Sequence, residues 1–269
     1  MERIQVLITT MHETDLSKFQ VMNIRSNAII ANQADRFDYM RQQIDGYDVQ
    51  MVTTATRGLS RNRNIGMSCI DKDADFILFA DDDLTFRDDY AQTICDVFQA
   101  HPEADAIKFN IDVSANSTRK LGMKPIQKYK KAGRRDVTAA AVFGMVIRTK
   151  VLLKYNLHFN EYFGAGTENY CGEDTIFLQD MLKNGVRLYM SPEVLATIDQ
   201  SESTWFSGYD EKYFEVKGMV LAAIYPKLSP LLAVRSAWRF ARKKKSDMSF
   251  SRILACYNRG IRRHLEREC

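Results

Sequence analysis

The apolar run Phe76–Phe79 is followed, after one alanine, by three consecutive carboxylates, Asp81, Asp82 and Asp83. A run this short and apolar is typical of a buried strand, and the acids then lie at its carboxyl end, where open α/β sheets bind ligands. Three adjacent negative charges repel, and burying them is costly unless cations neutralise them. Mg²⁺ and Mn²⁺ prefer carboxylate oxygens and share their coordination shell with substrate phosphates. The pattern predicts a divalent metal site for a phosphate-bearing ligand, with a solvated acidic turn as the alternative.

Apolar runs alternate with polar, helix-compatible stretches along the first half of the chain. Strands are predicted at residues 4–8, 28–30, 49–52 and 76–79, and a helix is predicted to open near Gly58 with Ser60 as its N-cap. Further along we expect a mobile loop at 114–136, a buried strand at 139–147 and a helix at 174–184 that Gly185 ends. This alternation predicts an α/β fold with a mixed, mostly parallel sheet flanked by helices.

Composition limits the class of protein and its compartment. The 269 residues are 45% hydrophobic, enough for one large domain or two small ones. We find no secretion signal at the N-terminus and no apolar window near the ~18 residues of a membrane span. The five cysteines are odd in number and scattered, which favours reduced thiols. We therefore expect a cytoplasmic protein.

Two further stretches carry candidate chemistry. Glu173 and Asp174 open a predicted helix behind a loop of aromatics and glycines, Tyr162–Gly166. One of these carboxylates is a candidate general base, while the loop suits close approach to a sugar ring; simple capping by the acids is the alternative. The segment 57–66 reads Arg-Gly-Leu-Ser-Arg-Asn-Arg-Asn-Ile-Gly. Arginines at a helix start suit phosphate oxygens, and a solvated basic face is the alternative.

The order of these motifs resembles that of nucleotide-sugar glycosyltransferases with the GT-A (Rossmann-like) fold, and most of all the inverting family 2 enzymes of bacterial polysaccharide and capsule synthesis. The family pattern G-x-S-x-A-R-N-x-G is matched by Gly58–Gly66, with Asn62 in place of Ala. Its D-x-D motif is matched within Asp81–Asp83, and its Glu-Asp pair by Glu173 and Asp174. The similarity covers roughly residues 3 to 205.

The resemblance implies a role for each matched position. Asp174 would be the catalytic base, beside Glu173, and Asp83 would hold a divalent metal, Mn²⁺ or Mg²⁺, together with Asp81. Asp82 takes either part, because the acidic run aligns in two registers. The donor nucleotide, a UDP-sugar, would contact Thr9, Thr10, Met11, Asp35, Arg57, Arg63, Asp81 and Asp82. The acceptor and the sugar would lie near Phe163, Gly164, Gly166 and Trp205.

The implied reaction is transfer of a hexosyl group from the nucleotide sugar to a hydroxyl of a saccharide acceptor, with inversion at the anomeric carbon. Two departures from the family pattern stand out. Thr9-Thr10 replaces the usual Pro-Thr after the first strand, and Ile198–Phe206 contains no His to complete the metal site. The third metal ligand is therefore open.

The C-terminus is strongly basic. Residues 227–269 carry twelve Lys/Arg and three Asp/Glu, a net +9 that leaves −5 for the rest of the total of +4. Two apolar stripes recur there at helical spacing beside arginines: Leu231, Val234, Trp238 and Ala241, then Ile253, Leu254, Tyr257, Ile261 and Leu265. Basic amphipathic helices with a Trp suit an anionic bilayer surface. We expect a catalytic domain at 1–226 and a helical extension at 227–269 that holds the enzyme on the inner face of the cell membrane, near a lipid-linked acceptor; packing of both stripes on the core is the alternative.

Three other functions fit parts of the sequence. A nucleic-acid-binding module would use the basic tail and the basic 119–135 segment, but their charges are not interleaved with aromatics in a recognised pattern, so we expect no nucleic-acid partner. A metal-dependent nucleotidyltransferase also uses strand-end acids, and it would not need a base at Glu173-Asp174. A non-catalytic sugar-nucleotide-binding relative would bind the donor without turning it over.

Overall fold

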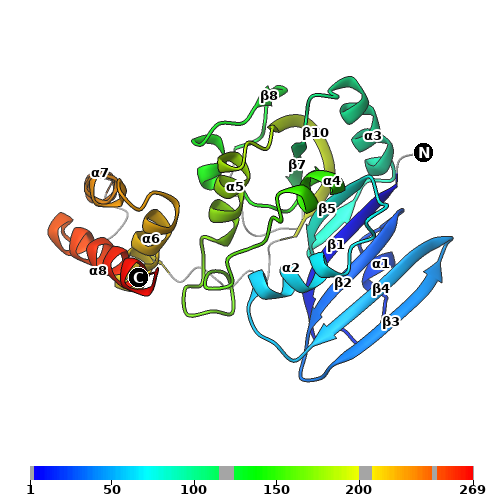
Figure 1. The fold of residues 1–269 in the computed structure, drawn as a ribbon, viewed down its shortest axis with the longest axis horizontal. Helices are drawn as coiled ribbons and strands as arrows, with labels where there is room; N and C mark the ends of the chain where they lie inside the picture. Colours follow the sequence, from blue (N-terminus) through cyan, green and yellow to red (C-terminus); the bar gives the residue numbers. More distant parts are fainter. Residues whose placement is uncertain (1–2, 115–123, 200–207, 244–246, 269) are drawn as a thin grey trace.

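The computed structural model describes residues 3–114, 124–199, 208–243 and 247–268 (Figure 1). Ten strands form one sheet in the order β3-β4-β2-β1-β5-β9-β7-β10-β6, with β8 paired to β10. The strands are β1 (Ile4–Met11), β2 (Asn27–Gln33), β3 (Asp38–Ile44), β4 (Tyr47–Thr54), β5 (Phe76–Asp81), β6 (Leu84–Phe86), β7 (Ala106–Val113), β8 (Lys130–Lys131), β9 (Met145–Arg148) and β10 (Leu188–Ile198). Neighbours β4, β2, β1 and β5 run parallel, as do β7 and β10. The predicted mixed α/β sheet is confirmed.

Helices cover both faces of the sheet because side chains alternate along its central strands. Val6 and Ile8 of β1 face the core formed with α1 (Lys18–Val21) and α3 (Tyr90–Ala100). Leu7, between them, faces the opposite core, formed with α4 (Thr149–Lys154) and α5 (Glu173–Lys183). Helix α2 (Leu59–Ser68) lies on this second face, where Gly66 packs against Leu7. The apolar runs read as strands are therefore buried on both sides.

Several elements differ from the sequence prediction, which named no strand at β6, β7, β8 or β10. Strand β3 was missed because it is a largely exposed edge strand; the Asp45-Gly46 turn joining it to β4, with φ of 51° and 84°, is a hairpin signal that the sequence did contain. The strand predicted at 139–147 is shorter, because a 3₁₀ turn η1 (Asp136–Ala139) precedes it and Gly144 adopts a φ of 72°. The N-cap of α2 is Gly58 and not Ser60. Part of the loop predicted at 114–136 lies outside the described residues.

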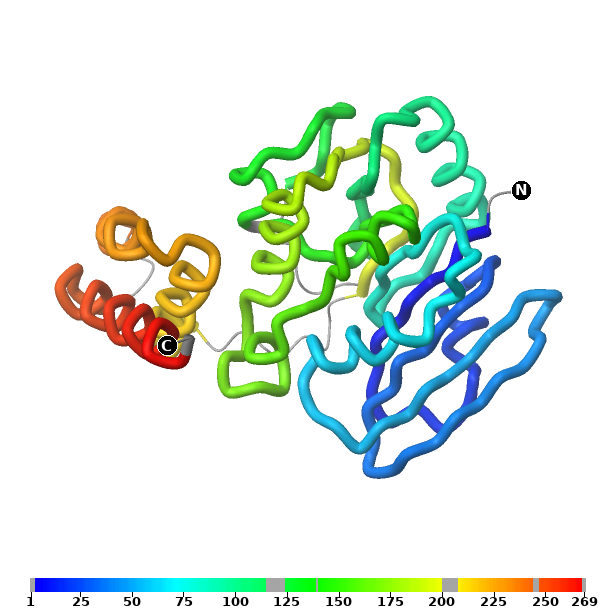
Figure 2. The backbone as a smooth tube through the Cα atoms, viewed as in Figure 1, coloured from blue at the N-terminus to red at the C-terminus, as the bar shows by residue number. Residues whose placement is uncertain are grey.

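The C-terminal helices α6 (Glu211–Ile224), α7 (Ser229–Arg242) and α8 (Phe250–Glu268) pack together at one side of the molecule (Figure 2). Helices α6 and α8 cross closely at two glycines. A Cβ added to Gly260 would lie 1.9 Å from the Glu215 carbonyl oxygen, and one added to Gly218 would lie 2.2 Å from the Tyr257 carbonyl oxygen. The boundary predicted at 226/227 falls between α6 and α7, inside this bundle.

The bundle joins the rest of the chain through the loop before α5. Phe163 and Cys171 of that loop share an apolar cluster with Val216, Met219 and Val220 of α6. The Arg263 guanidinium of α8 forms a salt bridge with the Glu168 carboxylate at 2.7 Å. The bundle therefore lies directly against the segment that leads into Glu173 and Asp174.

Candidate active site

The candidate site is built at the carboxyl ends of the parallel strands β1 and β5. The register of these neighbours places Thr9 opposite Asp81. The Thr9 hydroxyl donates to Asp81 Oδ1 at 3.3 Å, and the Thr10 hydroxyl donates to Asp82 Oδ2 at 2.6 Å. Thr9, which replaces the usual Pro, and Thr10 thus hold the orientation of the first two carboxylates.

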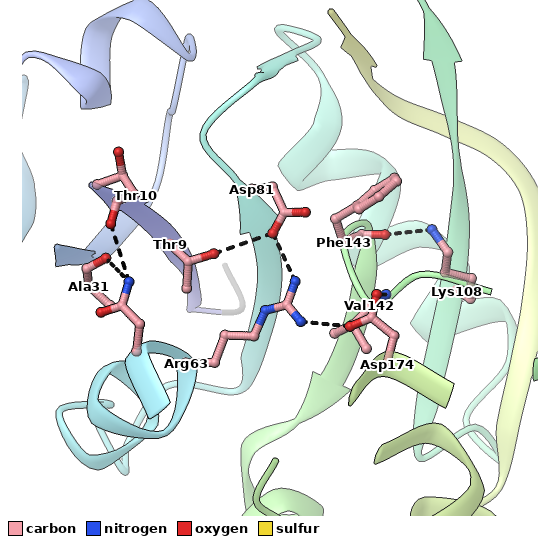
Figure 3. Close-up of polar contacts among 10 residues, drawn as sticks. Thr9, Thr10, Ala31, Arg63, Asp81, Lys108, Val142, Phe143 and Asp174 are labelled. Atoms are coloured by element: carbon pink, nitrogen blue, oxygen red, sulfur yellow. Dashed lines mark hydrogen bonds and ion pairs between the residues drawn. The ribbon is translucent and has the colours of Figure 1, made fainter. Parts of the chain in front are cut away.

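Arg63 joins this strand edge to helix α5 (Figure 3). Its Nη2 donates to Asp81 Oδ1 at 3.0 Å and its Nη1 donates to Asp174 Oδ1 at 2.6 Å. The Arg63 side chain is only 3% exposed and also lies over the Phe159 ring at 5.0 Å. Burial opposes the charge of Arg63, but the carboxylates of Asp174, Asp81 and Glu173 outweigh it and raise the pKa of the guanidinium. One buried cation therefore organises three of the predicted site acids.

The first turn of α2 is fixed by side chains that point inward. The Asn62 amide donates to the carbonyl oxygens of Ala31 at 2.7 Å and Thr10 at 3.3 Å. The Ser60 hydroxyl donates to the Phe163 carbonyl oxygen at 2.6 Å. These bonds set the position of Arg63, the residue that follows Asn62. Asn62 was expected only as a departure from the family pattern, and its positioning role is visible only in the structure.

Asp83 differs from its two neighbours because one of its carboxylate oxygens has no hydrogen-bonding partner. Its Oδ1 atom is buried and no described group donates to it. Burial, followed by repulsion from Asp81 and Asp82, raises the pKa of Asp83 to about 7. A divalent cation would supply the missing partner and relieve the repulsion, so Asp83 fits the predicted metal. Among the described residues no group of three or more His, Cys, Asp or Glu side chains could hold a metal.

Glu173 and Asp174 begin α5 directly after Gly172. Gly172 has a φ of 106°, and a Cβ there would lie 2.3 Å from Val220 Cγ2, so this position requires glycine. Asp174 Oδ2 accepts a hydrogen bond from the Val142 N–H at 3.2 Å, in addition to the bond from Arg63. Burial and then the Asp174 charge raise the pKa of Glu173, although Arg63 acts in the opposite direction. The pair therefore contains one carboxylate held by donors and one whose charged form is disfavoured by burial.

Lys108 is a site-adjacent residue that the sequence prediction missed. Its Nζ donates to the Phe143 carbonyl oxygen at 2.5 Å (Figure 3). It also donates to the Phe109 carbonyl oxygen at 3.1 Å. Burial lowers the pKa of Lys108 to about 8, partly offset by the charges of Asp174 and Asp81. Lys108 thereby anchors the backbone next to Val142. A lysine inside an apolar strand sequence, Ala106–Phe109, was the available signal.

The other predicted nucleotide contacts are less constrained. Met11 ends β1 with 59% of its surface exposed. Asp35 and Arg57 are also exposed, each in the loop beyond a strand, β2 and β4 respectively. All three lie on the side of the sheet where the carboxyl ends of its parallel strands meet.

The predicted sugar contacts divide into three cases. The Phe163 ring is fully buried against α6 and is not available to stack on a sugar, so that expectation is wrong. Gly164 and Gly166 adopt φ of 114° and 82°, and a Cβ on Gly164 would lie 3.3 Å from Glu173 Cγ. These glycines therefore allow the loop to pass close to Glu173. Trp205 lies outside the described residues.

Comparisons with known proteins agree with this arrangement. Residues 24–155 match the family model described as glycosyl transferase family 2. The structure of S. aureus TarS 1–349 in complex with UDP-GlcNAc is similar with a TM-score of 0.59 at 13% identity, covering 99% of this chain and 72% of that one. S. aureus TarS gives a TM-score of 0.60 at 14% identity, covering 89% of this chain and 44% of that one. A comparison with curated protein sequences gives no match. Over residues 24–155 the chain is therefore similar to glycosyl transferase family 2, and its sheet and helices have the GT-A fold.

Proposed function

We propose that the protein transfers a sugar from a nucleotide-sugar donor, a UDP-sugar, to a hydroxyl of a saccharide acceptor. The observation that carries this proposal is the pairing of strand-end acids with Asp174 through the buried Arg63. This arrangement puts a proton acceptor next to the carboxylates that would face the donor diphosphate. The S. aureus TarS structures contain UDP-GlcNAc and UDP, which supports a UDP-linked donor.

The roles follow from the geometry and from the chemistry of a departing diphosphate. A divalent metal bound at Asp83 would act as a Lewis acid on the diphosphate oxygens. Arg63 places fixed positive charge where negative charge develops on the donor. Asp174, oriented by Arg63 and Val142, takes the proton of the acceptor hydroxyl, which attacks the anomeric carbon from the face opposite the leaving group. Such a single displacement inverts the configuration.

We further propose that the protein acts in bacterial cell-surface polysaccharide synthesis on a lipid-linked acceptor. It would be attached to the inner face of the cell membrane. No helix of the described residues is long and apolar enough to cross a membrane. Residues 1–226 would then hold the catalytic machinery, and the basic residues 227–269 would add the attachment.

The test uses Asp174→Asn, which keeps the shape of the side chain and a hydrogen-bond acceptor for Arg63. We expect turnover to fall by about 10³-fold, in the range seen for loss of a general base, while the donor Kd changes little. Glu173→Gln is the matched control. Donor affinity falling as much as turnover would show that Asp174 is structural. A panel of UDP-sugars and UTP, assayed with and without Mn²⁺, separates sugar transfer from nucleotidyl transfer.

A further inference from the structure

Helix α7 packs with its small residues and exposes its large apolar ones. Ala233 and Ala237 are fully buried against α6 and α8. Leu231, Val234 and Trp238, on the opposite face, are 69%, 44% and 55% exposed. With the exposed Leu228 and Phe250 they form what we call the α7 patch: Leu228, Leu231, Val234, Trp238 and Phe250. A soluble helix normally turns its large apolar side chains toward the core, so this face is built to contact something else.

The charges beside the α7 patch have one sign. Arg235, Arg239 and Arg242 are exposed on the same helix, and the Arg242 guanidinium lies 5.2 Å from the Trp238 ring centre. No salt bridge joins these three arginines to an acid within the described residues. The patch therefore combines apolar side chains with uncompensated positive charge.

Helix α8 shows the contrasting case. Its stripe residues Ile253, Tyr257 and Ile261 are buried in the bundle, so this stripe packs on α6 and does not face outward. Three of its five arginines form salt bridges with acids, among them Arg252 and Arg259 with Glu211 at 2.7 and 2.9 Å. The two helices look alike in sequence, but only α7 retains an exposed apolar and basic face.

We propose that the α7 patch is a docking surface for an anionic lipid bilayer. Exposed aliphatic and Trp side chains enter the headgroup boundary, and the flanking arginines pair with lipid phosphates, which is the chemistry that this combination recognises. The inference rests on the peripheral membrane placement proposed above and assigns it to the outward face of α7, together with the adjoining Leu228 and Phe250. It excludes α8 as a second docking helix.

Docking at α7 would also orient the active site. Within the bundle, α6 is the helix that packs against the Gly172 turn. The Val220 side chain of α6 fills the space beside Gly172. The Arg267 guanidinium of α8 lies 3.7 Å from the centre of the Tyr162 ring. The bundle and the loop before α5 therefore behave as one packed body, so a bilayer on α7 sets where that loop faces.

The experiment is co-sedimentation of the full chain with vesicles of phosphatidylcholine alone and of phosphatidylcholine with phosphatidylglycerol. We expect binding only to the anionic vesicles, weakening as salt rises. Arg235→Glu with Arg239→Glu should lower the affinity by roughly 30-fold or more, since each basic residue contributes about a fivefold factor at an anionic surface. Leu231→Ser with Trp238→Ser should lower binding by about tenfold or more at low salt.

Two controls lie elsewhere on the surface. Val21→Ser changes a residue of α1 that is 67% exposed, and Lys72→Glu reverses an exposed charge; both should bind like the wild type. Deleting residues 227–269 is not a suitable test, because it would remove α8 from the core of the bundle. All point variants should retain wild-type UDP-sugar affinity without vesicles.

Three results would overturn the docking surface. They are absence of vesicle binding at low salt, binding that the α7 substitutions leave unchanged, and a dimer that these substitutions convert to a monomer, which would show that a second copy covers the patch. The proposed sugar transfer is tested separately. Wild-type protein that binds vesicles but neither binds nor turns over any UDP-sugar would refute that function and leave the docking surface in place.

Discussion

Replacing Asp83 with Asn should stabilise the metal-free protein at alkaline pH. The Oδ1 atom of Asp83 is buried without a donor, and burial together with the charges of Asp81 and Asp82 raises its pKa to about 7. Ionising this side chain therefore opposes folding. Asparagine has nearly the same shape and carries no charge, so the substitution removes the repulsion without leaving a cavity.

The magnitude follows from proton linkage. A pKa that rises from 3.8 in the unfolded chain to about 7 in the folded one corresponds to about 4 kcal/mol at pH values above 7. Two effects reduce this value, because the three carboxylates also repel in the unfolded chain and Asp83 keeps some contact with solvent. We expect a gain of about 2 kcal/mol. Because the pKa of Asp83 is raised, the wild-type protein keeps its full stability below about pH 4 and loses part of it as the pH rises through 7. The wild type and the Asp83→Asn variant should therefore be equally stable in acid.

Urea denaturation at about pH 4 and about pH 8, in buffer treated with a chelator, measures the difference directly. Adding Mn²⁺ at pH 8 should reverse the order, since an ion that binds at 100 times its Kd stabilises the wild type by about 2.7 kcal/mol and has a weaker site in the variant. A variant that is no more stable than the wild type at pH 8 without metal would show that Asp83 is neither strained nor poised for a cation. The sugar-transfer activity of the Asp83→Asn variant should fall even as its stability rises, as expected for a functional site.

Three further predictions follow from the same geometry. Mn²⁺ affinity, measured by calorimetry, should rise about tenfold from pH 6 to pH 8, because Asp83 must lose its proton to bind the ion; a flat profile would contradict a metal at Asp83. Arg63→Met should cost about 3–5 kcal/mol in unfolding free energy, because it leaves part-buried carboxylates without their cation. Arg61→Met, which breaks an exposed pair, should cost under about 1 kcal/mol. Equal losses in the two variants would refute the buried network. Gly260→Ala should lower the unfolding free energy by about 1–3 kcal/mol or more, because its Cβ would overlap the α6 backbone, and the exposed Asn258→Ala on the same helix should be near neutral; a stable Gly260→Ala protein would show that α6 and α8 do not cross so closely.

Local patterns were sufficient to predict the parallel centre of the sheet and the site acids at its edge. Runs such as Phe76–Phe79 are apolar at every position because both faces of the strand are buried, and this is visible in the sequence alone. The edge strand β3 has no such run, since its side chains are mostly exposed, and only its Asp-Gly turn marks it. The composition of the segment 140–144 predicts a strand, but the segment turns at Gly144, which has a positive φ. The segment lies beside Asp174 instead, where the Val142 N–H donates to the carboxylate.

The sequence determined which residues carry charge and which helices are amphipathic, because both properties depend on residue type and spacing. Only the tertiary structure decided which charges are compensated. Arg63 reaches Asp81 and Asp174 across gaps of 18 and 111 residues, while Asp83 Oδ1 is buried without a donor among the described residues. The two basic amphipathic helices also became distinct only on packing. Acids of α6 and of the loop before α5 pair with Arg252, Arg259 and Arg263 of α8, while no described acid lies within salt-bridge distance of the arginines of α7. Compensation of a charge depends on the distance to its neighbours in space, which periodicity along the chain does not encode.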